Sequence, residues 1–109
     1  MSHDPLLDKF REVRSLLTAF KNTLNKQKRF TPETASVFGD EDRKFWALQE
    51  DHERRKHSGI SPASRDAMME LLAAQAVRWA RLCDLAERGE EVEGDLAGSG
   101  ASRGAARPR

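Results

Sequence analysis

From Leu6 to Leu24 the chain reads LLDKFREVRSLLTAFKNTL, its most regular apolar pattern. Six large apolar residues recur there at alternating steps of four and three: Leu6, Phe10, Val13, Leu17, Phe20 and Leu24. On a helix this spacing draws one apolar line along one side. Because such a line is unfavourable in water, the pattern predicts a helix that packs against another apolar surface.

Three places in the sequence carry a helix-start signal, a capping side chain followed by proline: Asp4-Pro5, Thr31-Pro32 and Ser61-Pro62. Gly39 is typical of a helix end, and the Asp40 that follows can cap the start of the next helix. We therefore expect an all-α protein, a small bundle of two long helices and a shorter middle helix, with one or two further turns before the middle helix. The expected ranges are about 5–28 and 62–88 for the long helices, 41–57 for the middle helix and 32–38 for a short helix of one to two turns.

Length and composition limit the possibilities. A chain of 109 residues forms one domain, and its net charge of +1 gives no overall pull toward nucleic acid or membrane. No apolar stretch is long enough to span a bilayer. The single cysteine, Cys83, agrees with a reducing compartment. No secretory signal is visible, and we place the protein in the cytoplasm by default. Glycine, alanine and arginine dominate the end, which predicts a bundle over 1–89 and a disordered tail over 90–109.

The two long helices have apolar stripes of matching length, about 36 and 40 Å, whereas the middle helix offers only about one apolar turn. Three outcomes fit: a monomeric bundle, a homodimer whose long helices form a four-helix core, or an apolar strip left for another protein. We favour the homodimer, because small helical chains often complete their cores by association. The expected interface residues are Leu6, Phe10, Val13, Leu17, Phe20, Leu24, Trp46, Met68, Leu72, Trp79 and Leu82.

Catalytic and metal-binding patterns are weak. His52 and His57 are five residues apart, which separates them on a helix, and Cys83 falls within an apolar arc where a thiol is inert. The carboxylates are scattered among basic residues, as expected of surface ion pairs. The sequence thus predicts a non-enzymatic protein with no catalytic residue, cofactor or metal.

A nucleic-acid role is the alternative. Residues 31–48 have the spacing of a helix-turn-helix, but Asp40, Glu41 and Asp42 would begin its second helix and repel phosphate. Basic patches lie at 21–29 and 54–56. The candidate phosphate contacts are Lys21, Lys26, Lys28, Arg29, Arg43, Arg54, Arg55 and Lys56. Our leading hypothesis remains a protein–protein interaction module, such as a small regulator, adaptor or assembly factor, that acts through helical surfaces.

Overall fold

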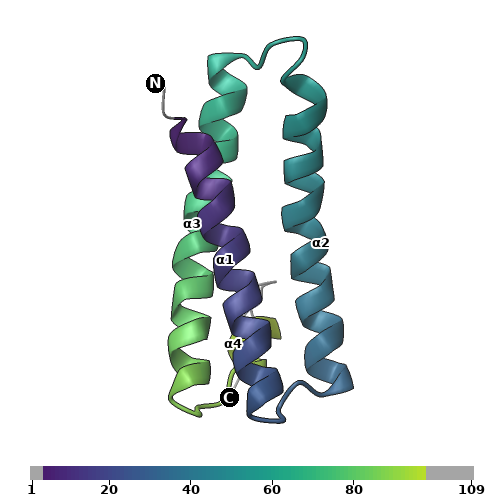
Figure 1. Ribbon diagram of the computed structural model, residues 1–109, viewed down its shortest axis with the longest axis vertical. Helices are drawn as coiled ribbons and strands as arrows, with labels where there is room; N and C mark the ends of the chain where they lie inside the picture. The colour runs from purple at the N-terminus through teal and green to yellow at the C-terminus, as the bar shows by residue number, and fades with distance from the viewer. Residues whose placement is uncertain (1–3, 98–109) are drawn as a thin grey trace, which may run out of the picture.

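The computed structural model describes residues 4–97, which contain four helices and no strand. The helices are α1 (Pro5–Lys26), α2 (Pro32–Arg55), α3 (Pro62–Glu87) and the short α4 (Glu93–Ala97). Helices α1 and α3 run in the same direction, with α2 antiparallel to both, and α4 lies at the end of the bundle where α1 and α3 finish (Figure 1). The predicted all-α bundle is confirmed.

Each long helix begins at a predicted capping signal. The side chains of Asp4, Thr31 and Ser61 accept hydrogen bonds from backbone N–H groups two or three residues later, and proline follows each of them. These acceptors satisfy N–H groups that have no partner inside the helix. The two long helices predicted from the apolar stripes end at Lys26 and Glu87, within two residues of expectation.

The prediction of a break at Gly39 is wrong, because α2 is one continuous helix of 24 residues. A glycine inside a helix costs only about 1 kcal/mol relative to alanine. Phe38 and Phe45, one heptad apart, are both buried on the same side of α2 and hold the helix across the glycine. Ion pairs between residues three apart, Arg43 with Asp40 and Lys44 with Glu41, span the same turns. Because α2 has no turn at Gly39, the predicted helix-turn-helix over residues 31–48 is excluded.

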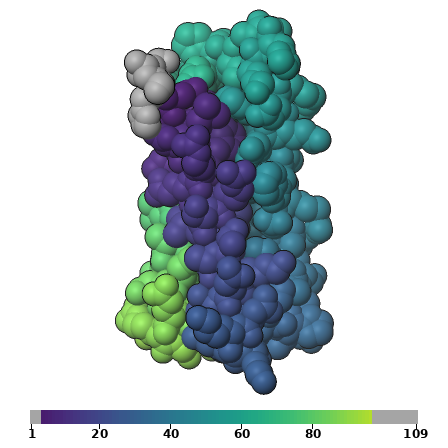
Figure 2. All heavy atoms as spheres, viewed as in Figure 1, coloured from purple at the N-terminus to yellow at the C-terminus, as the bar shows by residue number. Residues whose placement is uncertain are grey.

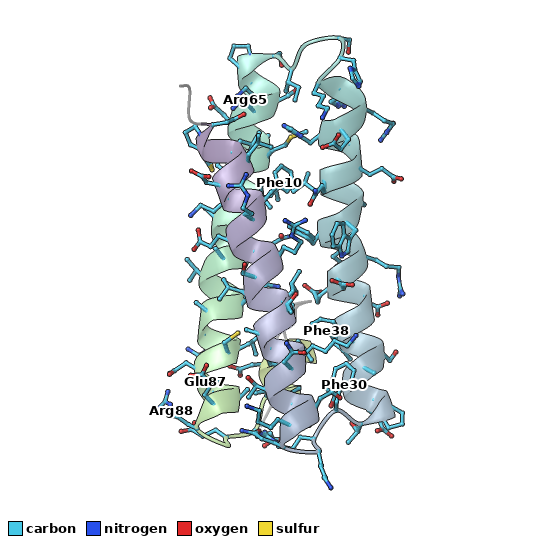
Figure 3. The ribbon with its side chains drawn as sticks, viewed as in Figure 1. Phe10, Phe30, Phe38, Arg65, Glu87 and Arg88 are labelled. Atoms are coloured by element: carbon cyan, nitrogen blue, oxygen red, sulfur yellow. The ribbon has the colours of Figure 1, made fainter. Side chains whose placement is uncertain are left out.

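Because α2 is about 36 Å long, it matches the two apolar stripes instead of falling short of them. Phe20 and Phe38 stack with ring centres 6.0 Å apart at one end of the bundle. Phe10 lies edge-on to Phe45 at 6.0 Å nearer the other end. Phe10 and Phe38 both lie between α1 and α2 (Figure 3). Helix α2 therefore covers, within one chain, apolar surface that the sequence pattern appeared to leave for a second molecule.

The bundle extends to Ala97, past the predicted boundary at residue 89. Val92 and Leu96 have no exposed surface and belong to the same hydrophobic core as the long helices. The Arg78 guanidinium donates to the Leu96 carbonyl at 2.7 Å, and the Arg29 guanidinium donates to the Glu90 carbonyl. Residues 98–109 of the predicted tail lie outside the described residues.

Candidate protein interaction site

Most of the predicted interface residues are the core of a single chain. Ten of the eleven have exposed fractions of 4% or less: Leu6, Phe10, Val13, Leu17, Phe20, Leu24, Met68, Leu72, Trp79 and Leu82. Their burial within one chain removes the reason for assigning them to a contact between chains. The eleventh, Trp46, is 42% exposed.

Trp46 is exposed because of its position on α2. The buried residues of this helix are Thr34, Phe38, Phe45 and His52, which share one side. Trp46 directly follows Phe45 and therefore lies about 100° around the helix from it. Its ring still touches that of Phe45, edge-on at 5.1 Å, so one edge of the indole is anchored while the rest faces solvent.

A hollow of about 320 Å³ lies between α1 and α2 on one side of Trp46. Figure 2 shows these two helices side by side on one face of the molecule, with α3 along the edge. The hollow is basic on the α1 side, and Asp42 contributes a carboxylate from α2. Its lining residues are Arg14, Leu17, Thr18, Lys21, Asn22, Phe38, Asp42 and Trp46.

A second hollow, of about 510 Å³, lies on the solvent side of α2. Its lining comes from α2 alone: Arg43, Trp46, Ala47, Gln49, Glu50 and Glu53. We call the exposed members of this set, without the half-buried Gln49, the outer face of α2.

A third hollow of about 390 Å³ lies between α2 and α3, where Leu71 is 55% exposed. Trp46 and Ala47 thus form the apolar centre of a surface that is otherwise charged.

Several carboxylates of α2 are held by cations. The hydrogen bond from Lys56 lowers the pKa of Glu53. The positive charge on Lys56, whose Nζ lies 2.8 Å from the Glu53 carboxylate, lowers it further. Asp51 accepts from both Arg54 and Arg55. Glu50 forms no ion pair among residues 4–97. The outer face of α2 therefore contains one carboxylate that is not engaged within the bundle.

The candidate nucleic-acid residues do not form one surface. Patch 54–56 lies where α2 ends and patch 21–29 where α1 ends, at opposite ends of the bundle (Figure 1). Arg43, Arg54, Arg55 and Lys56 each pair with a carboxylate of their own helix.

In patch 21–29, Lys21 lies over the ring of Phe30, 6.0 Å from its centre. Arg29 donates to Gln27 and to the Ala86 and Glu90 carbonyls. It therefore binds backbone carbonyl groups at the C-terminal end of α3. For Lys26 and Lys28 no ion pair is formed within the described part of the chain. Most of the predicted cations thus serve the bundle itself.

Cys83 and His52 are placed for packing. Cys83 is 7% exposed and its Sγ contacts the Leu16 carbonyl oxygen at 3.3 Å. Burial, with a smaller effect from the charge of Glu87, raises the pKa of Cys83 to about 11. His52 is buried against the ring of Phe10, at 5.2 Å. Across residues 4–97, no three His, Cys, Asp or Glu side chains are grouped to hold a metal ion.

The outer face of α2 was only partly visible in the sequence. Trp46 is one of the predicted interface residues, but Ala47, Glu50 and the neighbouring Arg14 are not. The spacing of Arg43, Trp46, Ala47 and Glu50 at three, one and three residues was available as a signal. The spacing alone does not show which side of this helix packs against the rest of the bundle, so it does not mark an exposed face.

Comparisons with known proteins found no matching family model, no matching curated protein and no matching solved structure. Within residues 4–97, none of the helices has the length and apolar character needed to cross a membrane.

Proposed function

We propose that this chain is a non-enzymatic protein–protein interaction module that works as a homodimer through the outer face of α2. The observation that carries the proposal is Trp46, a large aromatic side chain left 42% exposed beside two hollows. Partly exposed tryptophan is enriched among the residues that dominate binding energy in protein contacts. Covering the indole in a dimer would remove apolar surface from water without disturbing the core.

A second copy suits this face because the face contains both signs of charge. Arg43 is a cation, Glu50 and Glu53 are anions, and the apolar pair Trp46–Ala47 lies between Arg43 and Glu50. A surface of this kind can be complementary to itself, as a two-fold contact requires. A reducing compartment such as the cytoplasm suits the module, because its single cysteine is free and buried.

The nucleic-acid alternative has less support. Its helix-turn-helix is absent, and its two patches are far apart and largely occupied by carboxylates, a ring or carbonyls. A titration against duplex DNA at two salt concentrations tests it. Binding at low salt with a steep loss at higher salt would favour this alternative over the interaction module.

Sedimentation equilibrium of the full chain at micromolar concentration tests the proposal. We expect a dimer, with Trp46→Ala weakening self-association by roughly tenfold or more. Val77→Ala is the matched control, because Val77 is an apolar residue of α3 that is 73% exposed; this variant should associate like the wild type. A wild-type monomer at every concentration, or equal effects of the two substitutions, would contradict the proposal.

A further inference from the structure

Arg43 and Glu50 are placed symmetrically about the centre of the outer face of α2. Arg43 lies three residues before Trp46, and Glu50 lies three residues after Ala47. Seven residues are close to two full helical turns, so both charges lie on the same side of the helix, about 10 Å apart along its axis. The midpoint between them falls between Trp46 and Ala47.

The two charges are available for contact with another molecule. Arg43 pairs with Asp40 of its own helix, but the two side chains are 75% and 62% exposed. Exposed pairs of this kind contribute little and exchange readily. Glu50 has no cation partner within residues 4–97. A cation brought by a second molecule would therefore find this carboxylate unoccupied.

The centre of the face has the shape for a close helix contact. Ala47 has a single methyl group, so another helix can approach the backbone there. The hollow of about 510 Å³ runs along the same turns and is lined on one side by the indole of Trp46. A second indole that enters this hollow would cover both rings at once.

We propose that two copies pack α2 against α2 in antiparallel orientation, about a two-fold axis between Trp46 and Ala47. In this register Arg43 of each copy pairs with Glu50 of the other, which forms two equivalent ion pairs around a Trp46–Ala47 centre. A parallel arrangement would place Arg43 opposite Arg43 and Glu50 opposite Glu50, and like charges repel. The inference rests on the proposed homodimer and specifies its orientation and register.

Charge reversal tests this register. In Arg43→Glu both facing positions are acidic, and in Glu50→Arg both are basic, so each variant should self-associate about tenfold more weakly than the wild type. An equimolar mixture of the two variants should form a heterodimer, because both pairs of positions 43 and 50 then have opposite charges. The double variant Arg43→Glu/Glu50→Arg should self-associate like the wild type.

Arg11→Glu is the matched control, since Arg11 is an exposed arginine of α1 that pairs with Asp8 three residues earlier, as Arg43 does with Asp40. It should leave the dimer unchanged, and thermal melting should show that all variants fold. Loss of self-association in Trp46→Ala, with no effect of the charge reversals and no heterodimer in the mixture, would overturn the register while leaving the homodimer in place. A wild-type monomer would overturn both.

Discussion

The Arg78 guanidinium of α3 donates a hydrogen bond to the Glu41 carboxylate of α2 at 2.7 Å, and the two side chains are only 23% and 13% exposed. The same guanidinium donates to the Leu96 carbonyl at 2.7 Å and lies 5.3 Å from the Trp79 ring centre. One side chain therefore connects α2, α3 and α4. It holds the middle helix, whose outer face we assign to dimer contact, in its place on the bundle.

Arg78→Ala should lower the free energy of unfolding by about 2 kcal/mol, because a part-buried carboxylate and a helix-end carbonyl both lose a charged donor. Urea unfolding followed by circular dichroism measures this change. Arg88→Ala is the control: Arg88 pairs with Asp84 and Glu90 at the surface, and its loss should cost less than about 0.5 kcal/mol. Equal effects of the two substitutions would show that Arg78 does not connect the helices as described.

Gly39→Ala should stabilise the protein by about 0.5–1 kcal/mol, because Gly39 lies inside α2 and alanine loses less backbone freedom on folding. A methyl group there would be 3.6 Å from the Arg43 guanidinium, which is ordinary contact. Gly89→Ala should instead destabilise by about 1 kcal/mol, since Gly89 has a φ of +75°. Thermal melts compare the two, and destabilisation by Gly39→Ala would indicate a turn at this position.

The Cys83 thiol should not react with a thiol reagent at pH 8 in the folded protein and should react fully in denaturant. Burial raises its pKa from 9.0 to about 11, so the thiol keeps its proton in the folded chain over a range where the unfolded chain loses it. The free energy of unfolding should therefore fall between pH 9 and pH 11. Cys83→Ala should remove this part of the pH dependence, and an identical profile in the variant would contradict the assignment.

Asp4 should make stability sensitive to acid. Burial alone raises its pKa, but hydrogen bonds from Arg65 and from the Leu6 N–H outweigh that effect, so the pKa lies below its usual 3.8. The stabilisation is present above pH 3.8 and is lost as the pH falls through the lowered value. Asp4→Asn should flatten the acid limb of a stability-against-pH curve. If the stability of Asp4→Asn falls as steeply in acid as that of the wild type, the acid sensitivity comes from other carboxylates.

The apolar pattern of the sequence was sufficient to predict α1 and α3, because nearly every buried position in them is a large apolar residue or alanine. For α2 the pattern was insufficient. Its core-facing line includes the polar residues Thr34 and His52, so it appeared to be two short pieces separated by Gly39. The structure accommodates these polar side chains through contacts distant in sequence: Thr34 donates to Glu93, and His52 packs on Phe10.

The short α4 was also beyond sequence reasoning. Five residues are too few to show a helical period, and Val92 and Leu96 lie among glycines and acidic residues typical of a tail. Its position depends on Arg78 and Arg81, which come from another helix. As for the candidate site, residue type is enough to pick out Trp46, whereas its exposure depends on which side of α2 packs against the other helices.

Disulfide trapping at Ala47 tests the central claim, that two copies meet on the outer face of α2. The variant Ala47→Cys, made with Cys83→Ala so that it contains one thiol, should form a covalent dimer under mild oxidation at low micromolar concentration. Val77→Cys in the same background should remain largely monomeric, since Val77 is 73% exposed on α3 and does not line either hollow beside Trp46. Equal, slow cross-linking of the two variants would contradict the account.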